Sequence, residues 1–170
     1  TKQKVYLDTA PLTTVPAILL TPHHKKGDKL PAIVAIHGHG PWGKDPVAGS
    51  KAPGPMAETQ SFNYDYGLQM AKRGYVVICP DMRPFGERSD TAPGERPLPG
   101  RDPCNVHFIK GALLGFNLLA CNLFDLSRCV DYLETLPCVD KDRIGAMGLS
   151  GGGAHVMHFS ALEERIKATD

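Results

Sequence analysis

Residues 143–154 read RIGAMGLSGGGA. The apolar run from Ile144 to Met147 is too short for a helix and fits a buried strand. Residues 148–152 then match the pattern G-x-S-x-G, and apolar side chains between residues 154 and 164 indicate a helix. The sequence therefore predicts a strand, a tight turn and a helix, in that order, with Ser150 in the turn.

The glycines around Ser150 have a physical reason. A turn this sharp puts the Ser150 backbone in a strained conformation, so Gly148 and Gly152 beside it must lack bulky side chains. It also lifts the Ser150 hydroxyl above the end of the strand and leaves the Gly151 N–H free to receive a developing oxyanion. These features are typical of a nucleophile elbow. The alternative is a Gly-rich turn in which Ser150 only caps the helix.

The composition describes one ordinary globular domain. The chain has 170 residues, 42% hydrophobic and 22% charged, which is enough to bury a core without disulfides or metal. A net charge of +1 with scattered basic residues argues against nucleic acid or an acidic membrane surface as partners. Without C-x-x-C or Cys/His ligand spacing, we expect no structural metal and no organic cofactor.

Five cysteines cannot all pair, and as reduced thiols they point to a reducing compartment. Localisation stays open because the sequence begins at Thr1 rather than at Met.

Strands are expected at residues 4–9, 15–20, 31–36, 75–79 and 144–147, and residues 165–169 look like the start of another. The segments 31–36 and 75–79 are apolar without polar alternation, as in parallel strands covered on both faces. Pro16 indicates an edge position for the second strand.

Helices are expected at residues 63–73, 105–115 and 154–164, and before Pro137. The helix before Pro137 is the clearest, with an apolar stripe at Leu119, Leu123, Leu126, Val130 and Leu133. Its other side carries Asp125, Arg128, Asp131 and Glu134, close enough for i,i+3 ion pairs. Residues 41–62 have no period and are expected to form an irregular loop, as is a Pro/Gly-rich segment through Arg101. Helices between strands predict an α/β fold with a mostly parallel sheet and helices on both faces.

A second motif, His37-Gly38-His39-Gly40, ends the strand at residues 31–36. Ligands of open α/β sheets bind outside the carboxyl ends of the strands, so this loop and Ser150 should face the same crevice. The glycines would let the His39 N–H turn towards Ser150 as a second oxyanion donor. We assign the His37 side chain to anchoring the loop rather than to catalysis. The alternative is a tight strand-ending turn without function.

Three segments together resemble the α/β-hydrolase superfamily, and more narrowly its dienelactone-hydrolase and acetyl-xylan-esterase-like branch. They are residues 31–40 (PAIVAIHGHG), 74–89 (GYVVICPDMRPFGERS) and 143–153 (RIGAMGLSGGG). The resemblance implies that Ser150 is the nucleophile and that the amides of His39 and Gly151 form the oxyanion hole. It also implies that Asp81 and Arg83 hold the loop after their strand. A solvated turn is the alternative for these two residues.

The sequence departs from the superfamily after Ser150, where the triad acid and then the His should follow in chain order. The residues available there are Glu163, Glu164, Asp170, His155 and His158. Both histidines lie on the helix that leads away from Ser150 and are expected to pack, while His107 precedes Ser150 and lies elsewhere. We therefore expect the acid and the base to lie beyond residue 170. The chain then reads as a single α/β-hydrolase domain over residues 1–170, incomplete at its C-terminus and truncated after the elbow.

The main hypothesis is a serine hydrolase of carboxylic esters, such as an acetyl or acyl esterase, with a small-molecule or carbohydrate ester as substrate. The sheet of a chain truncated after the elbow would end in an open edge. The missing C-terminal part or another chain must cover this edge. A peptidase of the same superfamily and a non-catalytic α/β binding or assembly module are the rivals. A dinucleotide-binding domain fits less well, because residues 148–153 are Gly-rich before a helix but lack the G-x-G-x-x-G spacing. The loops 41–62 and 84–103 would line the crevice. Four aromatic residues of these loops are candidates for the walls of the crevice: Trp42, Phe62, Tyr64 and Phe85. The alternative is that they only pack within the loops.

Overall fold

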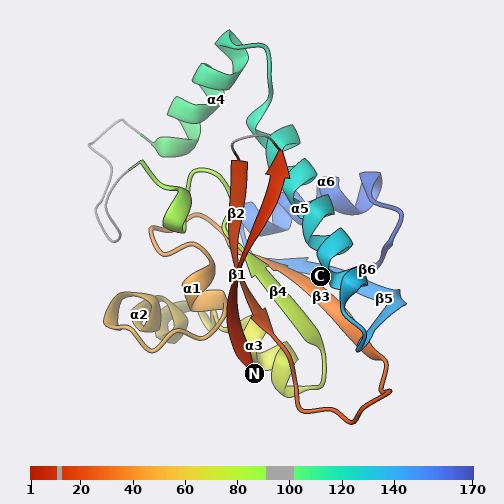
Figure 1. Cartoon of the computed structure of the whole chain (residues 1–170). Coiled ribbons are helices and arrows are strands. Elements are labelled where there is room, and N and C mark those ends of the chain that lie inside the picture. The colour runs from red at the N-terminus through yellow and green to blue at the C-terminus, as the bar shows by residue number, and fades with distance from the viewer. Residues whose placement is uncertain (11–12, 91–101) are drawn as a thin grey trace.

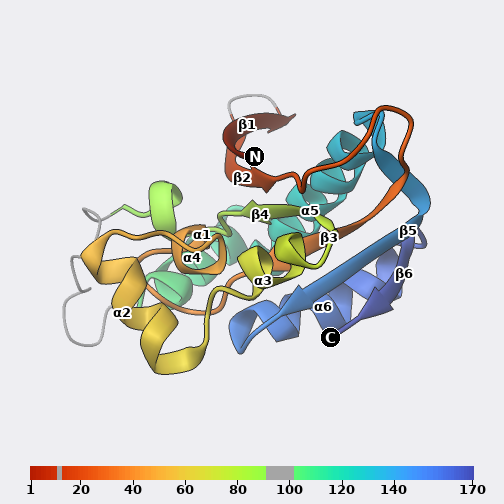
Figure 2. The ribbon, with the colours of Figure 1, turned by 90° about the horizontal axis from the view of Figure 1, so that it is seen from below.

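A six-stranded sheet forms the centre of the computed structural model, which describes residues 1–10, 13–90 and 102–170 (Figure 1). Its strands are β1 (Lys2–Ala10), β2 (Thr13–Leu20), β3 (Leu30–Ile36), β4 (Val76–Pro80), β5 (Val139–Gly148) and β6 (Ile166–Thr169). The strand order is β1-β2-β4-β3-β5-β6, from one edge to the other (Figure 2). β2 is antiparallel to β1 and β4, and the other neighbouring strands are parallel. The predicted mostly parallel α/β sheet is confirmed.

The helices of the described residues are α1 (Lys44–Val47), α2 (Pro53–Phe62), α3 (Tyr66–Lys72), α4 (Pro103–Leu113), α5 (Leu118–Thr135) and α6 (Gly151–Leu162), with a 3₁₀ turn η1 (Gly86–Arg88). α5 and α6 pack on one face of the sheet, and α1 and α3 pack on the other. α4 projects from one end of the molecule (Figure 1). Within the described ranges, no single helix is long and apolar enough to cross a membrane. Only α4 and α5 taken together reach that length and apolar character, and the pair is bent by 99°.

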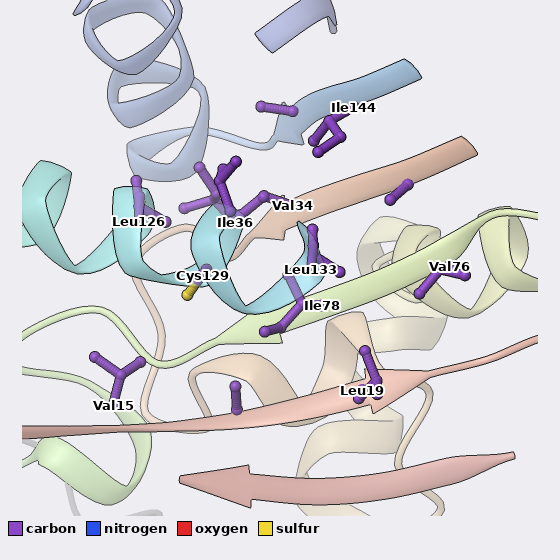
Figure 3. Packing of buried hydrophobic residues seen from close by; sticks show 14 of the residues in the cluster. Val15, Leu19, Val34, Ile36, Val76, Ile78, Leu126, Cys129, Leu133 and Ile144 are labelled. Carbon is purple, nitrogen blue, oxygen red and sulfur yellow. The ribbon is translucent and has the colours of Figure 1, made fainter. Parts of the chain in front are cut away.

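Alternate residues of the strands belong to two separate hydrophobic cores, because successive side chains of a strand point to opposite faces of the sheet. In β3, Ala32, Val34 and Ile36 join the core under α5 and α6 (Figure 3). Ile33 and Ala35 join the core under α1 and α3. β3 and β4 are therefore covered on both faces, as their apolar sequences predicted.

The position of β2 differs from the prediction, since β2 is an interior strand between β1 and β4. Its ladder with β4 begins at Ala17, one residue after Pro16. The Pro16 carbonyl accepts a hydrogen bond from the Asp81 N–H at 2.9 Å. Since the N–H and C=O of a strand residue point to the same side, the donor that proline lacks would face the loop after β4, beyond the ladder. The proline thus removes no bond between β2 and β4.

The segment 41–62 also differs from the prediction, because it contains α1 and α2 rather than only irregular loop. α2 begins with Pro53 at its first position, which is a favourable place for proline. Its only fully buried residue is Pro55, so no apolar stripe marks the helix in the sequence. The expected loop through Arg101 includes residues 91–101, which lie outside the described residues.

The register of the parallel strands brings the two sequence motifs together. Ile36 at the end of β3 lies opposite Gly148 at the end of β5. The loop that begins at His37 and the turn that contains Ser150 therefore leave the sheet side by side, at its carboxyl edge.

Candidate active site

Ser150 lies at the junction of β5 and α6, with φ 56° and ψ −117°. A non-glycine residue with positive φ is uncommon, and here it is both strained and solvent-exposed. Ser150 occupies the N-cap position of α6, yet its hydroxyl makes no capping hydrogen bond to any described residue. The geometry therefore disagrees with the alternative in which Ser150 only caps the helix.

The glycines on either side allow a close contact between the turn and β3. A Cβ on Gly148 would lie 2.5 Å from the carbonyl carbon of Gly152. A Cβ on Gly152 would lie 2.1 Å from the carbonyl oxygen of Ile36. Real Cβ atoms do not approach other heavy atoms this closely, so both positions require glycine. The start of α6 can thus pack directly against the end of β3.

His39 and Gly151, the two predicted oxyanion donors, lie next to each other. A Cβ on Gly151 would be 2.5 Å from Nδ1 of His39, so the imidazole rests against this glycine. Within the described part of the chain, neither the His39 nor the Gly151 N–H donates a backbone hydrogen bond. For Gly151 this follows from its place as the first residue of α6, where an amide has no acceptor within its helix. Both N–H groups are available to an acceptor from outside.

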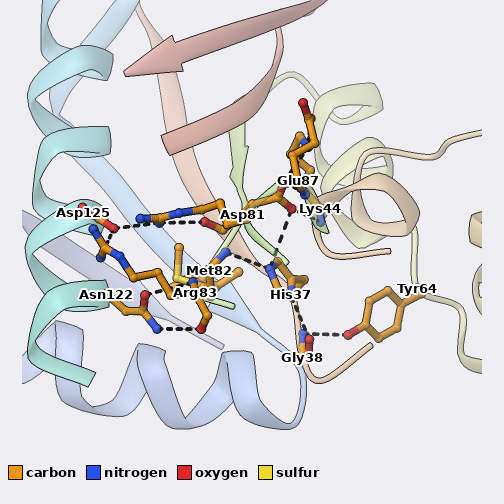
Figure 4. Close-up of polar contacts among 12 residues, drawn as sticks. His37, Gly38, Lys44, Tyr64, Asp81, Met82, Arg83, Glu87, Asn122 and Asp125 are labelled. Carbon is orange, nitrogen blue, oxygen red and sulfur yellow. Dashed lines mark hydrogen bonds and ion pairs between the residues drawn. The ribbon is translucent and has the colours of Figure 1, made fainter. Parts of the chain in front are cut away.

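His37 is buried and ties the 37–40 loop to the loop after β4 (Figure 4). Its Nε2 accepts a hydrogen bond from the Met82 N–H at 2.9 Å, and its Nδ1 lies 2.7 Å from the Gly38 carbonyl oxygen. An Nε2 that accepts must be unprotonated, so Nδ1 carries the proton and donates to Gly38. Burial lowers the pKa of His37, although the Asp81 carboxylate 4.0 Å away acts in the opposite direction. This geometry is that of the expected loop anchor.

Asp81 forms the centre of a buried polar cluster beside this loop (Figure 4). Its carboxylate accepts from the Lys44 backbone N–H at 2.8 Å, from the Lys44 ammonium at 2.6 Å and from the Glu87 N–H at 3.1 Å. Burial opposes the charged form of Lys44, but the carboxylates of Asp81 and Glu87 outweigh it and raise the Lys44 pKa. Asp81 thus holds the loop after β4 in place, as predicted, and does not lie in a solvated turn. Lys44 was not singled out in the sequence, because its burial depends on this tertiary contact.

Asp125 was assigned to the polar side of its helix, and this assignment is wrong. Its side chain is buried and accepts from the Thr9 hydroxyl at 2.7 Å, from Arg88 at 2.8 Å and from Arg83. Arg83 thereby joins the loop after β4 to α5, in agreement with its expected structural role. The expected i,i+3 pair on α5 is present between Arg128 and Asp131, at 2.8 Å.

A pocket of about 320 Å³ opens beside His39 and Gly151. Phe85 forms part of its wall and meets the His39 ring edge-on, with ring centroids 5.2 Å apart. Of the other aromatic residues considered as crevice walls, Tyr64 is buried, and Phe62 is 67% exposed. Trp42 packs against α2, where a Cβ on Gly54 would lie 2.1 Å from its ring. Only Phe85 of the four lines this pocket.

His155, His158 and His107 were considered as possible bases, and the structure places each of them elsewhere. His155 lines the same pocket, but its Nδ1 lies 2.7 Å from the Gly151 carbonyl oxygen and its Nε2 lies 3.1 Å from the Asn122 amide nitrogen. Burial lowers the pKa of His155. His158 is exposed on α6, and His107 lies 2.7 Å from Asp90. His155 packs as expected, whereas His158 is exposed rather than packed, and its Nδ1 lies 2.8 Å from the Ala154 carbonyl oxygen.

Known proteins with a similar sequence or fold agree with this geometry. A family model described as acetyl xylan esterase (AXE1) matches residues 56–170. The chain belongs to the acetyl xylan esterase family. Its sequence is 30% identical to the uncharacterized protein PA2218 of Pseudomonas aeruginosa over 155 residues, 91% of this chain and 32% of that protein.

Two solved structures have the same fold. A Bacteroides fragilis protein, provisionally assigned as an acetyl xylan esterase, superposes with a TM-score of 0.82 at 24% identity, over 99% of this chain and 43% of that one. Acetyl xylan esterase 1 from Thermoanaerobacterium sp. JW/SL YS485 superposes with a TM-score of 0.69 at 22% identity, over 99% of this chain and 46% of that one. The chain therefore spans less than half the length of these acetyl xylan esterase family relatives. The α/β-hydrolase fold and the acetyl-xylan-esterase-like resemblance predicted from the sequence are confirmed, and the family is one of hydrolases.

Proposed function

We propose that the protein is a serine hydrolase of carboxylic esters, with Ser150 as its nucleophile. The observation that carries this proposal is the strained, exposed backbone of Ser150 between β5 and α6, beside the 37–40 loop. A hydroxyl on such a turn reaches out from the sheet and is free of the helix it precedes. The β5–α6 turn then serves as a nucleophile elbow.

In the proposed reaction, Ser150 Oγ attacks the ester carbonyl carbon and forms a tetrahedral intermediate. The negative charge on the former carbonyl oxygen is stabilised by the N–H groups of His39 and Gly151. The alcohol then leaves with a proton, and water releases the acid from the acyl-enzyme. The substrate class is a small or carbohydrate ester, with acetyl esters first, in keeping with the family.

This chemistry needs a base, because a neutral serine hydroxyl is a poor nucleophile. The histidines described above are bonded elsewhere or exposed away from Ser150, except His39, whose ring lies against Gly151. We propose that the triad acid and His come from polypeptide outside residues 1–170. The two amides alone would give weak rate enhancement and no efficient turnover.

The same outside polypeptide, or a second copy of the chain, is proposed to cover the free edge of the sheet. In the described residues β6 pairs only with β5, and its other edge is open. A groove of about 450 Å³ lies beside it, lined mostly by apolar residues of β3, β5 and β6. An exposed strand edge of this kind is a site for pairing with another chain.

Hydrolysis of p-nitrophenyl acetate by the intact protein tests the proposal. We expect Ser150→Ala to lower kcat by about 10⁴-fold or more, and Ser160→Ala, farther along α6, to leave it unchanged. Activity that survives in Ser150→Ala would remove Ser150 from the mechanism. Faster cleavage of a prolyl-peptide anilide than of acetyl esters would instead indicate a peptidase of the same superfamily.

A further inference from the structure

Two tyrosines, Tyr64 in the turn between α2 and α3 and Tyr66 at the start of α3, bond to the backbone at the end of β3 and the start of the 37–40 loop. The Tyr64 hydroxyl accepts a hydrogen bond from the Gly38 N–H at 2.6 Å (Figure 4). The Tyr66 hydroxyl donates to the Ile36 carbonyl oxygen, also at 2.6 Å. These bonds hold the backbone on both sides of His37, at the point where β3 ends.

The bond from Tyr64 holds the peptide group that directly precedes the one containing the His39 N–H. The Gly38 carbonyl and the His39 N–H belong to the same planar peptide. His37 holds that carbonyl through Nδ1 at 2.7 Å, and Tyr64 holds the N–H of Gly38. The peptide planes on both sides of Gly38 are therefore held by side chains. Glycine is otherwise the most freely rotating residue, so without these bonds the direction of the His39 N–H would vary.

Tyr64 also lies close to the turn that carries Ser150. A Cβ on Gly38 would be 2.8 Å from the Tyr64 hydroxyl oxygen and 3.2 Å from Cβ of Ser150. The same atom would be 2.6 Å from the Leu149 carbonyl oxygen. The Tyr64 hydroxyl, Gly38 and the Ser150 turn thus meet at one point.

The turn that carries Tyr64 is itself firmly held. Asn63 ends α2 in the left-handed conformation, with φ 52° and ψ 42°. The Gln69 side-chain amide donates to Asn63 at 2.9 Å and to Asp65 at 2.6 Å, on either side of Tyr64. The Tyr64 and Tyr66 rings pack edge to face, with centroids 5.7 Å apart. Burial raises the pKa of Tyr64, so its hydroxyl remains protonated and neutral around pH 7.

We propose that Tyr64 is a positioning residue, which fixes the Gly38 peptide so that the His39 N–H points at the developing oxyanion beside Ser150. This inference rests on the proposed function and adds to it a residue outside both sequence motifs. Tyr64 acts through the backbone and does not touch the reacting atoms.

The test compares Tyr64→Phe with Tyr75→Phe in the intact protein. Tyr75 follows α3 and lines the groove beside β6, away from the 37–40 loop. For p-nitrophenyl acetate, we expect Tyr64→Phe to lower kcat about 10-fold with KM changed less than about twofold. The inhibition constant of a boronic acid, which forms a tetrahedral adduct on serine, should rise by the same factor. In amide hydrogen exchange by NMR, the Gly38 N–H should lose protection. Tyr75→Phe should leave all of these values unchanged.

A wild-type kcat and unchanged boronic acid inhibition in Tyr64→Phe would overturn the inference, as would unchanged protection of the Gly38 amide. A rise in KM without a fall in kcat would also overturn it, because it would assign Tyr64 to substrate binding. These outcomes differ from failure of the proposed function, in which the wild type itself would show no Ser150-dependent hydrolysis.

Discussion

At the scale of single residues, Ser150 occupies a backbone conformation that costs a side-chain-bearing residue about 1–3 kcal/mol. Glycine adopts it without this strain but loses more entropy on folding. We therefore expect Ser150→Gly to raise the free energy of unfolding by about 1 kcal/mol, while Ser150→Ala, which keeps the strain, has little effect. Urea unfolding measures both. Ser160→Gly, within α6, should lower stability by about 1 kcal/mol, and a loss of the same size in Ser150→Gly would contradict the account.

His37 predicts a dependence of stability on pH. Its folded-state pKa is lowered by burial, whereas in the unfolded chain it is near the ordinary value of about 6.5. At pH values between these two pKa values, the unfolded state binds more protons than the folded state does. The contribution of His37 to stability is therefore complete above about pH 6.5 and is lost as the pH falls below that value.

Urea unfolding between pH 8 and pH 5 checks this dependence. The free energy of unfolding should decrease towards pH 5, and the decrease should be smaller in His37→Gln. His23→Gln, at an exposed position, should keep the wild-type decrease. An equal decrease in all three proteins would show that His37 is not the group responsible.

The sequence indicated Ser150, His39 and Gly151 as candidates because the chemistry proposed for them depends on local spacing that short motifs preserve. It did not indicate the roles of Tyr64 or Lys44. Tyr64 meets Gly38 across 26 positions of the chain, and Lys44 meets Asp81 across 37 positions. Such contacts leave no local pattern of residues, so their roles become visible only in the fold.

At the scale of elements, β3, β4 and α5 were predicted well. The apolar run of each strand covers nearly its whole length, and the apolar stripe of α5 extends over several helical turns. α2 was missed because it buries little of its surface, and β2 was misplaced because its proline faces past the end of the β4 ladder. Asp125 was misplaced for a related reason. An apolar stripe locates the buried side of a helix but does not exclude a charged residue that finds partners there.

The partners of Asp125 join α5 to β1 and to the loop after β4. Removing its charge would leave Arg88, whose side chain is only 9% exposed, without its carboxylate. We expect Asp125→Asn to lower the free energy of unfolding by about 3–5 kcal/mol. Asp131→Asn on the exposed side of α5 should lower it by less than about 1 kcal/mol, since its ion pairs reach solvent. Equal losses in thermal or urea unfolding would show that the buried cluster does not stabilise the helix.

At the scale of the whole molecule, the open edge of β6 predicts association. Residues 1–170 on their own should form dimers or larger species in size-exclusion chromatography with light scattering. Ala168→Lys should weaken this association, because Ala168 is exposed on β6 beside the apolar groove and a charge there disfavours pairing of strands. A stable monomer without the substitution would contradict the proposal that other polypeptide covers this edge.

The proposed function depends on the chemistry of the Ser150 hydroxyl, and a fluorophosphonate probe tests that chemistry directly in the intact protein. Such a probe reacts with a serine only when the hydroxyl is activated and an oxyanion hole accepts the new charge. We predict a single phosphonylated residue, Ser150, identified by peptide mass spectrometry and absent in Ser150→Ala. An unlabelled protein, or a label on another residue, would contradict the serine hydrolase mechanism and favour a non-catalytic α/β module.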